Sequence, residues 1–247
     1  INDSDAEKIS TFMTSLKATS GLREAIKRLI EPDIWNKTIL KTIHSGIDLN
    51  RFSQIEKKDK KLHKEYNIPF DTPLIGNVAA IAPHKDYFTF INTAETLVKK
   101  KYNLKFIIIG TGPMEEEIKN YCNQKKLNEH IIFTGFRTDI EEILPELDIF
   151  LITSKTEGLG TSIIDAFACK VPVVATRAGG IPEIVKHEKS GLLANVKDSD
   201  ELANQVERIL KGSVNTSKII DGQQDILTNF TKSATAEKTL LEYLSLK

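Results

Sequence analysis

Short runs of apolar residues recur along the chain, each followed by a loop and then by apolar residues at helical spacing. The clearest run is Ile149–Ile152, which is bounded by polar residues, as expected for a strand buried on both faces. Similar runs cover 74–82, 104–109 and 131–133, and 87–101 has helical spacing. This alternation predicts an α/β fold with a Rossmann-like, doubly wound, mostly parallel sheet of about six strands.

The two ends of the chain are predicted to be largely helical. Apolar residues recur at helical spacing over 1–36, and two amphipathic helices are expected at roughly 214–228 and 231–246. Residues 37–44 are predicted to form a strand. We therefore predict a helical segment over 1–36, left from a preceding domain or linker, and a main domain over 37–247. The chain begins with Ile1 rather than Met, from which we expect a longer parent protein.

Composition narrows the functional classes. The 247 residues carry 34 basic and 34 acidic side chains, a balance that argues against a nucleic-acid-binding protein. Neither a signal peptide nor an apolar run near 18 residues is found, and the two cysteines form no metal-binding spacing, so we predict a cytoplasmic protein. The lysine-rich stretch 53–66 favours a solvated helix face. A membrane-surface patch, with contact at the inner face of a membrane, is the alternative.

A candidate anion-binding site follows the run Ile149–Ile152. Glu157 opens the sequence Gly158, Leu159, Gly160, Thr161 and Ser162, after which apolar residues recur at helical spacing. Backbone N–H groups at a helix start have no partner inside the helix, and glycines let a phosphate or sugar approach them closely. Asp165 lies eight positions after Glu157, so both carboxylates can face one cleft. The alternative is a tight turn flanked by solvated carboxylates.

A G-x-G pair and two D-x-D sequences resemble known motifs only in part. Gly110 and Gly112 follow a predicted strand, but Glu115 stands where a dinucleotide-binding fingerprint requires its third glycine, which argues against a dehydrogenase. Two D-x-D matches, at residues 3–5 and 198–200, are weak evidence for a metal site, and the second is better explained as a helix N-cap. We predict no metal site and no cofactor.

The segment E-G-L-G-T-S-I-I-D-A-F-A-C-K-V-P-V-V-A-T-R-A-G-G-I-P-E-I-V, residues 157–185, resembles the signature of the family 4 retaining glycosyltransferases of GT-B architecture. The resemblance covers about residues 37–247. Residues 45–52, S-G-I-D-L-N-R-F, are similar to the family's turn into its C-terminal domain. The resemblance implies that this chain is the C-terminal, donor-binding half of such an enzyme.

The resemblance also implies roles for individual residues. Glu157 would hold the donor-sugar hydroxyls, the amides of 158–161 the sugar and phosphate, Asp165 the ribose hydroxyls and Lys85 the diphosphate. Glu157 and Lys85 would be the catalytic pair, because Lys85 and the helix amides would stabilise the leaving diphosphate. The family has an arginine where this chain has Ala80. His84 or the amides would then take more of the phosphate.

Further donor-binding residues are implied at the ends of the next two strands. In the family a G-x-G-P sequence lies beside the nucleotide pocket, which points to Gly110 and Gly112. A strand ending in x-F-x-G precedes a loop that contacts the base through backbone atoms, which points to Gly135, Phe136 and Arg137. An aromatic residue at position 136 could equally belong to the core.

The expected function is transfer of a sugar from a nucleotide-diphosphate donor to a glycan, lipid or small-molecule acceptor, with retention and without a metal. The expected partners are the nucleotide sugar and an N-terminal domain that carries most of the acceptor site. The isolated chain is expected to be inactive. Two alternatives remain: a non-catalytic nucleotide-sugar-binding module, and a GT-B epimerase or phosphorylase. Without its N-terminal domain, the last helix is expected to fold onto the chain or to expose an apolar stripe.

Overall fold

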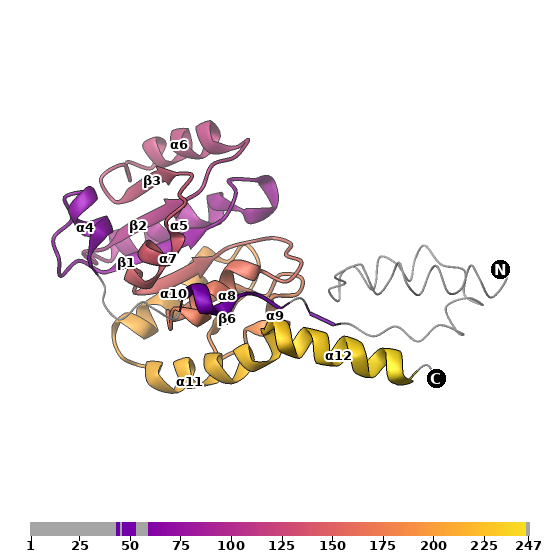
Figure 1. Ribbon diagram of the computed structural model, residues 1–247. Coiled ribbons are helices and arrows are strands. Elements are labelled where there is room, and N and C mark those ends of the chain that lie inside the picture. The colour runs from indigo at the N-terminus through magenta and orange to yellow at the C-terminus, as the bar shows by residue number, and fades with distance from the viewer. Residues whose placement is uncertain (1–42, 45, 53–58, 246–247) are drawn as a thin grey trace. The chain divides into compact units, whose positions relative to one another are not determined.

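The computed structural model describes residues 43–44, 46–52 and 59–245 (Figure 1). The chain divides into two compact units, one formed by Ile1–Asp48 with Leu227–Lys247 and the other by Leu49–Ile226. The predicted helix 1–36, the predicted boundary at Lys37 and most of the predicted strand 37–44 lie outside the described residues. The described part of the predicted helix 53–66 contains α4, Lys61–Glu65.

The larger unit is built on a six-stranded, all-parallel sheet in the order β3-β2-β1-β4-β5-β6 (Figure 1). Its strands are β1 (Leu74–Val78), β2 (Lys105–Ile109), β3 (Ile131–Gly135), β4 (Ile149–Ile152), β5 (Val173–Thr176) and β6 (Leu192–Ala194). The prediction of an α/β fold with a doubly wound parallel sheet is confirmed. Three- to five-residue apolar strands suffice because helices cover the sheet on both faces.

The helices alternate with the strands. In chain order they are α5 (Tyr87–Lys99), α6 (Glu115–Gln124), α7 (Ile140–Ile143), α8 (Thr161–Ala168), α9 (Ile181–Ile184), α10 (Ser199–Leu210) and α11 (Thr216–Leu227). Short 3-10 turns η1 (Leu49–Phe52), η2 (Pro83–Lys85) and η3 (Leu144–Glu146) interrupt the connections. Asp198 is the N-cap of α10, and its carboxylate accepts a hydrogen bond from the amide N–H of Glu201 at 2.8 Å. The prediction of an N-cap at this position is confirmed.

One hydrophobic core lies between a face of the sheet and helices α5, α6 and α10. Phe90 of α5 and Phe106 of β2 meet there edge to face, with ring centroids 6.0 Å apart. On the other face, the side chain of Leu147 fills the space that a Cβ on Gly76 would need, and α8 packs near β5. Both faces of the central strands are therefore covered, which explains their almost entirely apolar sequences. The buried Asn77 of β1 is the exception, and its side-chain amide donates to Leu151 O at 2.6 Å.

Strand β1 is shorter than predicted, because the expected strand 74–82 ends at Val78. The next residues stay bound to the neighbouring loop through Ala79 N–H to Ile109 O at 3.1 Å and Ile81 N–H to Thr111 O at 3.0 Å. Gly110 interrupts the ladder because its φ of +137° turns the chain away from strand geometry. The backbone after β1 and after β2 therefore continues beyond the sheet edge without regular strand geometry. Lys85 lies in this part of the chain, in η2.

The smaller unit pairs the chain before Leu49 with the C-terminal region. Ile47 donates its N–H to Phe230 O at 2.8 Å, and Thr235 donates its hydroxyl to His44 O at 2.8 Å. The last helix, α12 (Lys232–Ser245), follows η4 (Thr228–Phe230). Leu240, Leu241 and Leu244 of α12 are each more than half exposed, so this helix presents an apolar stripe. In the part of the chain that is described, no helix combines the length and apolarity needed to cross a membrane.

Candidate functional site

The carboxyl ends of β1 and β4 form the centre of the site. These strands are neighbours in the sheet, although β2 and β3 come between them in sequence. The helices after β1 and after β4 therefore leave the sheet edge toward opposite faces of the sheet. Ligands of open α/β sheets bind at such a switch point.

Lys85, in the loop after β1, and Glu157, in the loop after β4, are in direct contact. The Lys85 Nζ lies 2.6 Å from Glu157 Oε2, and the two side chains are 15% and 12% exposed. The Ser154 hydroxyl donates to the same oxygen at 3.0 Å. Glu157 Oε1 has no hydrogen-bond partner among the described residues. The contact thus supplies a buried ammonium beside a carboxylate that has one oxygen to spare for a hydroxyl donor.

The start of α8 supplies backbone donors next to this pair. The N-cap is Gly160, in left-handed geometry with φ +76°, and no side chain caps the helix. Within the described ranges, the amides of Thr161 and Ser162 have no acceptor. Gly158 and Thr161 are exposed. An anion or a sugar oxygen can therefore approach these amides directly.

Gly179 and Gly180, between β5 and α9, hold the loop of Glu157 in place. Gly180 donates its N–H to Glu157 O at 2.9 Å. A Cβ on Gly179 would lie 2.1 Å from Glu157 O, and one on Gly180 would lie 1.9 Å from Gly158 O. Only residues without a side chain fit here, so the paired glycines are explained by close backbone packing behind the site.

The glycines at 110 and 112 have the same role on the other side. A Cβ on Gly110 would lie 2.2 Å from Ala79 O, and one on Gly112 would lie 2.4 Å from Ile81 O. The loop after β2 thereby supports the loop that carries Lys85. This packing accounts for both glycines, and their contact with a nucleotide stays a prediction.

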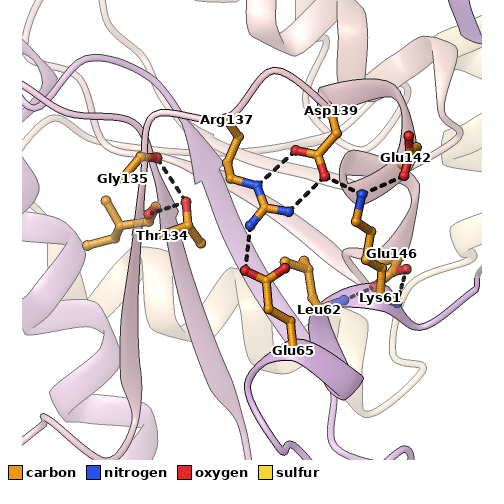
Figure 2. A network of polar contacts seen from close by, with 10 residues as sticks. Lys61, Leu62, Glu65, Thr134, Gly135, Arg137, Asp139, Glu142 and Glu146 are labelled. Carbon is orange, nitrogen blue, oxygen red and sulfur yellow. Dashed lines mark hydrogen bonds and ion pairs between the residues drawn. The ribbon is translucent and has the colours of Figure 1, made fainter.

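The loop after β3 presents Phe136 and fixes Arg137. The Phe136 ring is 74% exposed, which excludes the alternative that it belongs to the core. Arg137 is bound on both sides, to the two oxygens of Asp139 at 2.8 and 2.7 Å and to Glu65 Oε1 at 2.6 Å (Figure 2). Its guanidinium therefore connects α4 to the loop after Gly135. A contact between Arg137 and a base would have to be made around these ion pairs.

Asp165 projects from α8 and is partly buried. Burial raises the pKa of its carboxyl above the ordinary value, while the Arg51 guanidinium opposes this rise and Glu141 adds to it. The Arg51 Nη2 lies 3.3 Å from Asp165 Oδ2. The sequence alone gave no reason to join residues so far apart in the chain, and the Arg51 contact is the main feature of the site that sequence reasoning missed.

The loop after β1 lacks the arginine that the resemblance led us to expect, and Ala80 is exposed in its place. His84 is exposed, and its carbonyl accepts the Lys155 N–H at 2.7 Å. The Lys155 ammonium lies 3.4 Å from the buried Asp86 carboxylate. Lys155 is thus a second cation beside this loop, also missed from the sequence. Over 43–44, 46–52 and 59–245, no group of three or more His, Cys, Asp or Glu side chains is arranged to hold a metal ion.

Comparison with known proteins shows the family of this chain. Residues 58–224 match the family described as "Glycosyl transferases group 1". The chain belongs to this family. Among similar proteins, N-acetyl-alpha-D-glucosaminyl L-malate synthase of Bacillus anthracis is 27% identical over 183 residues, which are 74% of this chain and 46% of that protein. A GDP-mannose-dependent alpha-(1-6)-phosphatidylinositol monomannoside mannosyltransferase of Mycobacterium tuberculosis is 28% identical over 69% of this chain and 46% of its own length. The chain therefore spans about half the length of these relatives.

Two solved structures show the same architecture. The C-terminal domain of LpcC from Francisella tularensis is 27% identical, with a TM-score of 0.64 over 74% of this chain and 97% of that domain. HepE from Anabaena, solved in complex with UDP-glucose, is 25% identical, with a TM-score of 0.76 over 93% of this chain and 63% of its own. These likenesses confirm the expected fold, that of a GT-B C-terminal domain.

Proposed function

We propose that this chain is the donor-binding half of a retaining, metal-independent glycosyltransferase that takes its sugar from a nucleoside diphosphate. The observation that carries the proposal is the contact between Lys85 and Glu157 at the β1–β4 switch point, next to the uncapped start of α8. A cation, a hydroxyl acceptor and free amides are the groups that a sugar diphosphate needs. Relatives that use GDP-mannose or bind UDP-glucose support this assignment.

Each group has a chemical task in this proposal. Lys85 has three N–H donors, so it can keep its bond to Glu157 and still reach a diphosphate oxygen. The spare Glu157 oxygen accepts a sugar hydroxyl, while the Thr161 and Ser162 amides bind sugar and phosphate oxygens. As the glycosidic bond breaks, negative charge builds up on the departing diphosphate. Lys85 and the amides are already oriented toward that charge, which lowers the barrier.

The nucleoside part is assigned to the neighbouring strand ends. Asp165 accepts hydrogen bonds from the ribose hydroxyls. The backbone around Gly110, Gly112 and Gly135 lines the base, with the exposed Phe136 ring beside it and Arg137 holding the loop. His84 lies at the phosphate end. The whole enzyme would act in the cytoplasm, or at the inner face of the membrane if its acceptor is a lipid.

Calorimetric titration of this chain with UDP, GDP and ADP tests the proposal. We expect one nucleotide to bind, and Lys85→Ala and Asp165→Ala each to weaken it about tenfold or more, the loss expected for a hydrogen bond to a charged group. The matched control is Lys99→Ala, which removes a 71% exposed lysine that is ion-paired within α5. Equal affinity of Lys85→Ala and the wild-type chain would refute the assigned site.

A second candidate function is a nucleotide-sugar-binding module without catalysis. The observation that favours it is the exposed Ala80 where the resemblance requires arginine. Loss of a bidentate guanidinium weakens the hold on a diphosphate and on the charge that develops in transfer. Ala80→Arg separates the two candidates. A large gain in affinity for the nucleoside diphosphate would favour a degenerate binding site, whereas no gain would indicate that Lys155 or the α8 amides already compensate.

A further inference from the structure

Arg51 lies between two carboxylates at the edge of the candidate site. Its Nη2 is 3.3 Å from Asp165 Oδ2, and its Nε is 3.3 Å from Glu141 Oε1. The guanidinium also stacks on the ring of Phe52, 4.5 Å from the centroid, and Phe52 is only 6% exposed. The contacts with Asp165, Glu141 and Phe52 together hold the Arg51 guanidinium. A lysine could supply the charge at this position, but it has neither the fixed set of N–H donors of a guanidinium nor a planar surface that stacks on the ring.

The Asp165 carboxyl needs such a neighbour. It is the shorter of the two acidic side chains, and its own side chain is 20% exposed. Burial and the nearby Glu141 both raise its pKa, and Arg51 is the cation that opposes them. Without Arg51, the surroundings of Asp165 would all favour the protonated acid.

We propose that Arg51 is a positioning residue that keeps Asp165 ionised and aims its second oxygen, Oδ1, at the ribose of the nucleotide. This inference rests on the proposed function, since it assigns Asp165 to the ribose. Arg51 takes Oδ2, and Oδ1 has no partner among the described residues. A carboxylate held in this way accepts a hydroxyl without first having to be deprotonated or reoriented.

The position of Arg51 in the chain also bears on its contact with Asp165. Arg51 lies in η1, the first element of the unit Leu49–Ile226. The N-terminal segment of the other unit ends at Asp48, the residue before η1. The segment that enters the nucleotide-binding unit thus contributes a residue to the site. The family resemblance implies that residues 45–52 form the turn into this domain, and Arg51 would give that turn a chemical role.

The first test measures the Asp165 carboxyl in the free chain by NMR titration with selectively labelled aspartate. Arg51→Gln is expected to raise the Asp165 pKa, and Arg51→Lys to raise it less. Arg208→Gln is the matched control, because Arg208 pairs with Gln205 and Glu188 on α10 and its surroundings, away from the site. An Asp165 pKa that is the same in Arg51→Gln and wild type would overturn the proposal, whatever the chain binds.

The second test compares UDP with 2′,3′-dideoxy-UDP in calorimetry, or the corresponding pair for the base that binds. Arg51→Gln and Asp165→Asn are each expected to weaken UDP about tenfold. Both should leave the dideoxy compound nearly unaffected, and the double variant should lose no more than either single one. A loss of equal size on both ligands would mean that Arg51 merely attracts phosphate, which overturns the inference.

The two proposals fail in different ways. If UDP binding depends on Lys85 and Asp165 but not on Arg51, the proposed function stands and the inference is wrong. If no nucleotide binds in a manner that depends on Lys85, the proposed function fails and the ribose role of Arg51 fails with it. The NMR titration would still report whether Arg51 controls the ionisation of Asp165.

Discussion

Gly179 shows how a single residue without a side chain holds the loop of Glu157 in place. It adopts φ +50°, and the Glu157 carbonyl lies where its Cβ would be. The loop of Glu157 can therefore rest directly on the loop after β5. Sequence motifs record such glycines, but the reason for them appears only when the two backbones are seen together.

Gly179→Ala is expected to destabilise the fold by more than about 2 kcal/mol, because it adds a backbone clash to left-handed strain. It should also displace Glu157 and weaken nucleotide binding. Gly212→Ala is the matched control, because Gly212 has φ +64° but open space around its Cβ. That variant should lose about 1 kcal/mol of stability and keep its affinity. Urea denaturation and calorimetry measure both effects, and equal losses in the two variants would contradict the packing argument.

Asp165 gives the site a defined pH response. Its pKa is raised in the folded chain, and in the proposed function its ionised carboxylate is the stronger acceptor for the ribose hydroxyls. Affinity for the nucleotide should therefore be full above that pKa and fall as the pH drops through it. Because the terminal phosphate also takes up a proton near pH 6, the pH dependence is measured in wild type and in Asp165→Asn. The difference between the two profiles isolates Asp165, and parallel profiles would exclude its participation.

At the scale of elements, an ion-pair network joins α4 to the loop after β3. Figure 2 shows Arg137 between Asp139 and Glu65, and Lys61 between Asp139 and Glu142. The Arg137 and Asp139 side chains are 15% and 18% exposed, which reduces screening by solvent. The Arg137 guanidinium lowers the pKa of Asp139 well below its ordinary value. The network therefore anchors the loop from which Phe136 projects.

Asp139→Asn is expected to lower the free energy of unfolding by about 1 kcal/mol at pH 7, as for a well-formed, partly exposed pair. A depressed pKa contributes stability above the unfolded value of about 4, and this contribution is lost as the pH falls through the folded pKa. The difference between variant and wild type should therefore shrink below about pH 4. Glu188→Gln is the control, since Glu188 is 55% exposed in its pair with Arg208. If the difference in the free energy of unfolding between Asp139→Asn and wild type does not change with pH, the ion pair of Asp139 is not its cause.

The elements themselves were largely predictable from the sequence, with informative exceptions. Uninterrupted apolar runs identify β4 and the other central strands because both faces of the sheet are covered. The strand β6, Leu192–Ala194, escaped prediction because three residues carry too little pattern. Strand β1 was predicted too long because residues 79–82 are also apolar, and they leave the ladder where Gly110 turns its partner away.

At the scale of the whole molecule, the parallel topology explains why most of the candidate site was predictable. Every βα loop returns to the same edge of the sheet, so residues just after strands converge without any knowledge of tertiary contacts. Lys85 and Glu157 both follow such strands, and the resemblance to the glycosyltransferase family singled them out. Arg51 comes from outside a βα loop, and Ser154 and Lys155 act through contacts that depend on how two loops meet. Such contacts are set by packing and leave no local signal in the sequence.

The last prediction concerns what this chain can do by itself. It spans 46% of the relatives' length, and the resemblance implies that most acceptor contacts lie in the other half. We therefore expect the chain to bind a nucleotide but to release sugar from radiolabelled UDP-glucose, UDP-N-acetylglucosamine or GDP-mannose at no more than the rate of its Lys85→Ala variant. If the chain is the donor-binding half of such an enzyme, as proposed, a separately expressed N-terminal half should restore transfer, because a donor held by Lys85 and Glu157 still lacks a positioned nucleophile. Sustained, Lys85-dependent turnover by the chain alone would show that its own residues supply an acceptor site.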